Sequence, residues 1–180
     1  MSSIEAHEFL AQERTVVCAT LGPRGWPHLM PLWYVLRTPL ETAEGEAMST
    51  PADAARTAEE TAGQAPGPQL WAWTYAASQK VRNIERDPRA TLQIETGELY
   101  QELRGVMLEC EVRIHRDLET VSALGSEILA RNAVARGEPA VELPAEAAAV
   151  VQQQAAKRVG LQFVELRRST WDHRKLAGVY

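Results

Sequence analysis

Several sequence signals are missing from this chain, and each absence excludes a class of protein. The 180 residues contain no run of about 18 apolar residues, so no transmembrane helix is indicated. The start of the chain lacks a basic segment followed by an apolar one, the mark of a secretory signal, so we expect a protein of the cytoplasm. The net charge of -5 argues against general binding to nucleic acids or membrane surfaces, because both are anionic.

Motifs for metal binding and for common catalysis are also missing. Cys18 and Cys110 lie in apolar runs without a cysteine or histidine at metal-ligand spacing, so we expect buried, free thiols and no disulfide. The four histidines are scattered, and the sequence predicts no metal site. No Gly-x-Gly-x-x-Gly, Gly-x-x-x-x-Gly-Lys-Ser/Thr or Gly-x-Ser-x-Gly motif occurs. The sequence therefore identifies no catalytic residue.

What is present is a series of short apolar runs separated by turn residues. We expect one domain over residues 1–180, since this length supports one core. Apolar and β-branched patterns predict strands over residues 15–21, 27–36, 70–75, 89–95, 100–114 and 159–166. Capping residues and helical spacing predict helices over residues 2–12, 117–132 and 144–157. The predicted fold class is α+β, a β-dominated split antiparallel β-barrel with peripheral helices.

Two strands contain residues that interrupt the expected pattern. In the strand over 27–36 both faces are largely apolar, so we expect cover on both sides. Pro31 cannot donate a hydrogen bond to a neighbouring strand, which indicates a bulge or a locally unpaired position. Gly105 indicates a bend where a strand passes from one layer to another.

Two segments fall outside this regular pattern. Residues 38–68 are rich in Ala, Glu, Thr, Gly and Pro without any aromatic residue, and we interpret them as a flexible insertion between strands. Residues 169–180 are aromatic and charged, and we expect them to lie over a site or a subunit boundary.

The stretch from Leu70 to Glu95 organises the rest of the chain. It predicts a strand, a helix over 79–86 with Ser78 as its capping residue, and a second strand after Asp87-Pro88 ends the helix. On a helical wheel Val81 and Ile84 share the apolar side and Arg82 and Arg86 face solvent. Lys80 and Asn83 fall at the border between them.

A phosphate seat is one interpretation of this helix start. The Ser78 hydroxyl, the free amides of the first turn and the Lys80 ammonium would together attract an anion. The other interpretation is a solvated basic helix with an ordinary serine cap. Residues 78–90 hold four basic and two acidic residues, so their local charge is positive within an acidic chain, which favours a small anionic ligand. Nearby aromatic residues are either core or the wall of a site for a planar ring: Trp33, Trp71, Trp73 and Tyr75.

Three segments resemble one known family. They read Thr-Leu-Gly-Pro-Arg-Gly-Trp-Pro-His-Leu-Met-Pro-Leu-Trp-Tyr over 20–34, Trp-Thr-Tyr-Ala-Ala-Ser-Gln-Lys-Val-Arg-Asn-Ile-Glu-Arg-Asp-Pro-Arg over 73–89 and Arg-Gly-Val-Met-Leu-Glu-Cys-Glu-Val over 104–112. They are similar to the pyridoxamine 5'-phosphate oxidase-like split-barrel family, and most similar to its flavin- and deazaflavin-dependent oxidoreductases. The most specific part is Ser-x-Lys-x-x-Asn-x-x-x-Asp-Pro.

The resemblance implies a homodimer with two clefts at its interface, each for FMN or for the deazaflavin coenzyme F420. Carried onto this sequence, it implies that the phosphate is held by Ser78, Gln79 and Lys80, with Asn83 supporting that loop. It implies that the ring is lined by Trp73 and Thr74 and by the backbone around Met30, Pro31, Leu32 and Trp33. Trp171 would approach from the partner subunit.

The function implied by the resemblance is F420-dependent hydride transfer to a small unsaturated substrate. One alternative is an FMN-binding oxidoreductase of the same family, and another is a cofactor-binding or sensory dimer without turnover. F420 has the longer anionic tail, which would require Arg82 or Arg86 to turn toward the cleft. The arginine and histidine that pyridoxamine phosphate oxidases place around their substrate are not recognisable, so that substrate is not assigned.

Overall fold

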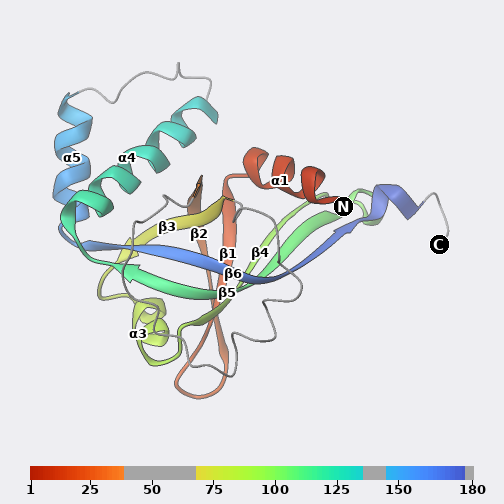
Figure 1. Ribbon diagram of the computed structural model, residues 1–180, viewed down its shortest axis with the longest axis horizontal. Coiled ribbons are helices and arrows are strands. Elements are labelled where there is room, and N and C mark those ends of the chain that lie inside the picture. Colours follow the sequence, from red (N-terminus) through yellow and green to blue (C-terminus); the bar gives the residue numbers. More distant parts are fainter. Residues whose placement is uncertain (39–67, 136–144, 177–180) are drawn as a thin grey trace.

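The fold is a closed antiparallel β-barrel. The computed structural model describes residues 1–38, 68–135 and 145–176, and Figure 1 shows their arrangement. Neighbouring strands pair in the order β1-β2-β3-β6-β5-β4. Their bounds are Thr15–Leu21 (β1), Pro27–Arg37 (β2), Gln69–Tyr75 (β3), Arg89–Thr96 (β4), Arg104–His115 (β5) and Arg158–Asp172 (β6). The predicted β-dominated α+β barrel is confirmed.

Helices surround the barrel, with α1, α4 and α5 along one side and α3 along the other in Figure 1. Their bounds are Ser3–Gln12 (α1), Gln79–Arg86 (α3), Leu118–Ala135 (α4) and Ala145–Ala155 (α5), with 3-10 helices at Tyr100–Glu102 (η1) and His173–Leu176 (η2). Local sequence sets their starts, since α1 has the predicted Ser2 and Glu5 capping box and Asp117 accepts the Thr120 amide at 2.8 Å. No helix in the described ranges is long and apolar enough to cross a membrane.

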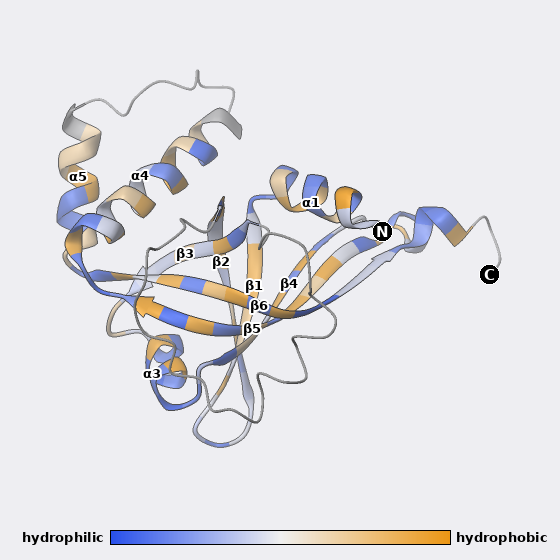
Figure 2. Cartoon of the chain, in the orientation of Figure 1, coloured by the Kyte–Doolittle hydropathy of each residue, from blue (hydrophilic) through white to orange (hydrophobic). Residues whose placement is uncertain are grey.

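The core lies inside the barrel and follows from strand alternation. In β1, Val16, Cys18 and Thr20 are buried whereas Val17 is exposed, and Figure 2 shows the same alternation of apolar and polar residues along β5 and β6. Cys18 and Cys110 are buried and free, as predicted, and burial raises the pKa of both thiols to about 12.

The last strand is longer than predicted, because it runs beyond residue 166 into the segment over 169–180; that this segment lies over a site or a subunit boundary stays a prediction. Ser169 to Asp172 continue β6 and pair with Met107 to Arg104 of β5. Trp171 lies over Gly105, where an added Cβ would come within 2.2 Å of the indole. Gly105 therefore provides space for a ring and not a bend, because the indole needs the room that a side chain would fill. Residues 177–180 and residues 39–67 of the predicted insertion lie outside the described residues.

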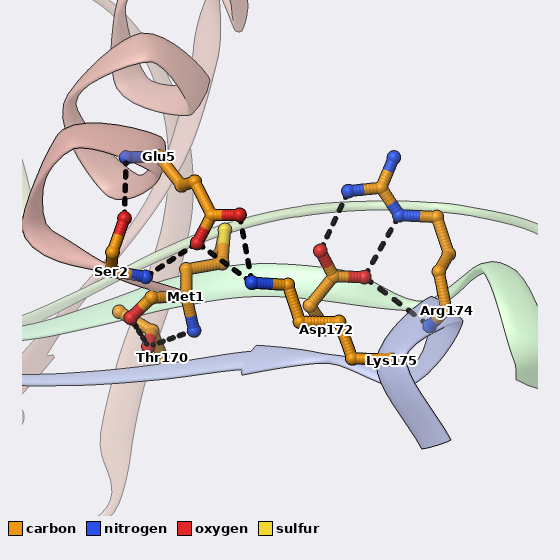
Figure 3. Close-up of polar contacts among 7 residues, drawn as sticks. All are labelled: Met1, Ser2, Glu5, Thr170, Asp172, Arg174 and Lys175. Carbon is orange, nitrogen blue, oxygen red and sulfur yellow. Dashed lines mark hydrogen bonds and ion pairs between the residues drawn. The ribbon is translucent and has the colours of Figure 1, made fainter. Parts of the chain in front are cut away.

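Polar contacts join the first helix to the end of β6 (Figure 3). The Met1 nitrogen donates to Thr170 Oγ1 at 3.0 Å, and Lys175 contacts the Glu5 carboxylate at 2.7 Å. Beside them, Asp172 accepts two hydrogen bonds from the Arg174 guanidinium, which lowers the pKa of that carboxyl to about 2. These contacts hold α1 beside the first residues of β5 and the last residues of β6.

The outer side of β2 differs from the prediction. Leu29, Met30 and Trp33 are 55%, 41% and 46% exposed, so the strand is not covered on both sides. Apolar residues on two faces indicate burial, but they do not distinguish cover by the same chain from cover by another molecule. Pro31 pairs with Val17 without a register shift, so there is no bulge. Its other edge is unpaired, as the second prediction for Pro31 stated, because β3 pairs only with the last four residues of β2.

Candidate functional site

The predicted phosphate seat lies where β3 leads into α3. The Ser78 amide donates to the Tyr75 carbonyl at 3.0 Å, and this turn places Ser78 directly before the helix. Ser78 has the extended backbone of a capping residue, but its hydroxyl makes no capping hydrogen bond, so that part of the prediction is wrong. The hydroxyl oxygen is buried and has no hydrogen-bond partner among the described residues. A buried polar atom without a partner is uncommon and leaves this hydroxyl available to a ligand.

Lys80 lies deeper than the helical wheel predicts. It is 6% exposed, and its Nζ donates to Thr74 Oγ1 at 2.9 Å. No carboxylate in the described part of the chain lies within 4.0 Å of that ammonium, and burial lowers the pKa of Lys80. The helical wheel placed Lys80 between the apolar and the solvent-facing sides because it considers α3 alone. In the fold, Thr74 of β3 contacts the Lys80 side chain and helps to bury it. The result is a buried cation whose one hydrogen bond within the described ranges goes to a neutral hydroxyl.

Asn83 is fully buried and ties α3 to the barrel. Its Nδ2 donates to Thr20 Oγ1 of β1 at 3.1 Å, and its Oδ1 accepts from Gln79 Nε2 at 2.8 Å. Asn83 thus fixes the Gln79 side chain, and its support of a phosphate-binding loop stays a prediction. Sequence reasoning missed Thr20, although strand alternation places it on the inner face of β1 beside Cys18.

These groups make a site that favours an anion. The structure brings Ser78, Gln79, Lys80 and Asn83 together, and it adds Thr74 from β3. All of them offer neutral donors or positive charge, and the unpaired amides at the start of α3 point the same way. Arg82 is exposed, and Arg86 donates to the Leu21 carbonyl at the end of β1. Arg86 also contacts the edge of the cluster, since its guanidinium donates to Asn83 Oδ1 at 3.5 Å.

The structure separates the two residues of β3 that the resemblance assigned to the ring. Thr74 is buried inside, whereas Trp73 points outward against α4, where a Cβ on Gly125 would lie 2.5 Å from the indole. The Arg158 guanidinium lies 4.4 Å from the Trp73 ring and 4.2 Å from the Tyr75 ring. Arg158 was also missed, because its contact with both rings depends on the β3 and β6 register.

The residues predicted from β2 lie along its unpaired stretch. Met30, Pro31 and Trp33 are exposed and Leu32 is buried. Within the described ranges, Pro27 to Trp33 have no strand on the β3 side, so backbone groups on that edge are not used in the sheet. These backbone groups remain available to another molecule. Across the described residues no three His, Cys, Asp or Glu side chains gather closely enough to hold a metal ion.

Solved structures with the same architecture include a protein of similar sequence. Protein Rv2991 of Mycobacterium tuberculosis, a conserved hypothetical protein, is 30% identical; the match covers 100% of this chain and 90% of that one with a TM-score of 0.72. An F420 reductase is 18% identical, with 91% and 95% of the two chains covered and a TM-score of 0.54. A FAD-binding protein of Mesorhizobium loti is 16% identical, with 94% of each chain covered and a TM-score of 0.55.

At these lower identities the last two comparisons show a shared fold alone. A comparison with curated proteins gave no match. The sequence itself matches the family described as pyridoxamine 5'-phosphate oxidase over residues 3–163, which include the barrel strands from β1 into β6 and the seat at α3. The barrel topology and the sequence match agree, and the chain belongs to the pyridoxamine 5'-phosphate oxidase family.

Proposed function

We propose that this protein binds a phosphorylated flavin-type cofactor and is an oxidoreductase, with F420-dependent hydride transfer to a small unsaturated substrate as its reaction. The observation that carries the proposal is the incomplete polar cluster at α3. Lys80 is buried without a carboxylate in the described chain, and the Ser78 hydroxyl beside it is buried without a partner. A phosphate would supply acceptors for both groups, since it is an anion with several oxygen atoms.

Each residue of the cluster has a defined role in this proposal. Ser78 and Lys80 donate to the phosphate, and Thr74 accepts from Lys80 Nζ at 2.9 Å and so orients the ammonium. Gln79 Nε2 donates to Asn83 Oδ1 at 2.8 Å, and this hydrogen bond orients Gln79 as the third donor to the phosphate. The ring lies along the unpaired edge of β2 at Met30 to Trp33. When bound, the cofactor supplies the hydride chemistry, so the protein needs to bind and orient rather than to act as an acid or base.

A homodimer is the second part of the proposal. One outer face of the β1 and β2 hairpin presents a row of apolar side chains in cross-strand register, and the row consists of Val17, Leu21, Leu29, Pro31 and Trp33. Contiguous exposed apolar surface of this kind is typical of an interface. A second copy covering this face would shield the β2 edge and exclude water from the ring.

An FMN-dependent oxidoreductase is the alternative that the same seat supports, because FMN also ends in a phosphate. Titration of the purified protein with FMN and with F420, followed by fluorescence, tests both. We expect saturable binding of at least one with one site per chain, and sedimentation at the mass of two chains. A protein that binds neither cofactor would contradict the proposal, and binding without reduction of any substrate would favour the dimer without turnover.

A further inference from the structure

We propose that a cleft at the tip of the β1 and β2 hairpin is a second anion subsite, which holds a negatively charged group that the cofactor carries beyond its first phosphate. This inference rests on the proposed function, because it extends the same binding site. It would make the protein select an extended cofactor over FMN, whose chain ends at the phosphate.

The cleft adjoins the phosphate seat. Its volume is about 370 Å³, and the described residues that line it are Gly22, Pro23, Arg24, Trp26, Pro27, His28 and Gln79. Gln79 stands between Ser78 and Lys80 in the chain, and Asn83 fixes its side chain at 2.8 Å. A ligand with its phosphate at Ser78 therefore reaches this cleft by continuing past Gln79.

The lining favours negative charge. Arg24 supplies a permanent cation, His28 an imidazole and Trp26 a broad apolar ring that is 75% exposed, and none of the described lining residues carries a carboxylate. Arg86 donates to the Leu21 carbonyl next to Gly22, which brings a further guanidinium to the same end of β1.

A second cleft of equal volume provides the contrast. It also measures about 370 Å³ and lies over β1, β4 and β5, but Asp87 and Glu109 are among its lining residues. Asp87 already holds Arg89 in an ion pair at 2.7 Å. An anion entering this second cleft would meet two carboxylates, so the hairpin cleft is the favoured path.

The hairpin tip holds its shape without a ligand. The Gly22 amide donates to the Trp26 carbonyl at 2.9 Å, and the Gly25 amide donates to the Gly22 carbonyl at 3.0 Å. Gly25 has a φ of 81°, which suits glycine, and a Cβ on Gly22 would lie 2.7 Å from the Trp26 carbonyl oxygen. Arg24 and Trp26 are thus carried by a turn with a defined backbone, so little backbone order has to be gained on binding.

Two kinds of cofactor carry the required group. F420 continues beyond its phosphate with carboxylates, and FAD continues with a second phosphate and an adenosine whose base can stack on an indole. Their shared chemistry is a second anion, and FMN lacks it. Comparison of the three cofactors therefore separates the contribution of the cleft to affinity from that of the phosphate seat.

The test measures dissociation constants of F420, FAD and FMN for the wild type, for Arg24→Ala and for Arg113→Ala, by fluorescence titration at two salt concentrations. Arg113 is an exposed arginine of β5 that lines neither cleft and serves as the control. We expect Arg24→Ala to weaken binding of F420 or FAD about 10-fold, the usual effect of losing one charged hydrogen bond, and to change FMN binding less than about twofold. Added salt should reduce this difference.

Each result decides the question. Loss for F420 alone identifies a carboxylate as the second group, and loss for FAD alone identifies a phosphate; both support the subsite. Equal loss for all three cofactors, no loss for any, or the same loss in Arg113→Ala overturns it while the proposed function stands. If the wild type binds none of the three, the proposed function and the subsite both fail.

Discussion

Two cations of this protein are removed from water in different ways. On α4, half-buried Arg131 donates to the carbonyls of Tyr34, Leu10, Ala11 and Glu13 at 2.7 to 2.9 Å, and its guanidinium lies 4.5 Å from the Tyr34 ring. Among the described residues Lys80 donates only to the Thr74 hydroxyl. Burial lowers the pKa of both cations.

The difference separates a structural cation from a binding cation. The carbonyls around Arg131 include the last ones of α1, the negative end of that helix, so the charge is compensated within the chain. Lys80 has no such compensation in the described residues, and Ser78, two residues before it in the chain, has a buried hydroxyl without a partner among those residues. A cluster completed by the chain stabilises the fold, whereas a cluster left incomplete is the one available to a ligand.

The largest effect should come from removing the structural cation. Arg131→Ala removes one donor from each of four carbonyls, of which Leu10 keeps the Tyr34 hydroxyl as a donor, and we expect the free energy of unfolding to fall by about 2 to 4 kcal/mol. Urea unfolding followed by tryptophan fluorescence measures it. Arg131→Lys is the control, since it keeps the charge but reaches fewer carbonyls and should lose less. A change below about 0.5 kcal/mol in Arg131→Ala would break the comparison.

Lys80→Met should have the opposite profile. Methionine retains the length and removes a buried charge, so we expect unfolding free energy to stay within about 1 kcal/mol of the wild type or to rise. Affinity for the phosphorylated cofactor should fall by about 1 to 3 kcal/mol, and Lys80→Ala should lose a similar amount. Titration of the folded variant measures the affinity. A Lys80→Met protein as destabilised as Arg131→Ala would assign Lys80 to the structural class.

Ser78→Ala should have a smaller effect of the same kind. Its hydroxyl makes no capping bond, so we expect a stability change below about 0.5 kcal/mol and a loss of affinity of about 1 kcal/mol. Ser2→Ala is the matched control, because the Ser2 hydroxyl does accept the Glu5 amide at 3.2 Å. That variant should lose about 1 kcal/mol of stability and no affinity. Equal stability losses in the two variants would mean that Ser78 caps α3 after all.

The smallest effect is a proton taken up on binding. The pKa of Lys80 is lowered by burial in the free protein, and an anion beside it favours the charged form and raises that pKa again. Binding therefore takes up protons once the pH is high enough for free Lys80 to lose its charge, and affinity falls as the pH rises through that range. Calorimetry at about pH 9, where the cofactor phosphate is fully ionised whether it is a monoester or a diester, in buffers of different ionisation enthalpy measures the uptake. Lys80→Met should take up none, and undiminished uptake in that variant would assign the proton elsewhere.

Most of the fold could be predicted because its signals are local. Strand alternation places Val16 and Cys18 inside, the Ser2 capping box starts α1, and Asp87-Pro88 ends α3. The length of β6 could not be predicted, because its last residues are polar and are held in the sheet by pairing with distant β5. The exposed face of β2 was missed for a similar reason, since apolar patterns do not reveal what covers them.

The candidate site was predicted as a set of residues but not as an arrangement. The Ser-x-Lys-x-x-Asn spacing identifies residues 78–83, and the structure brings them together. The depth of Asn83 depends on Thr20, which lies 63 residues away in sequence, and the depth of Lys80 depends on how α3 folds back against Thr74 of the preceding strand. Arg158 has no local signal at all, because only the β3 and β6 pairing brings it onto two aromatic rings.

The fit of Trp73 against Gly125 would link α4 to the affinity for the proposed cofactor. The indole occupies the space that any larger residue at position 125 would need, and Trp73 is the direct chain neighbour of Thr74. A bulkier residue on α4 would displace this tryptophan, shift the end of β3 and move the hydroxyl that orients Lys80. Substitutions on α4, which donates nothing to the ligand, would then change the binding affinity. The affinity could thus change in small steps while the residues of the phosphate seat stay the same.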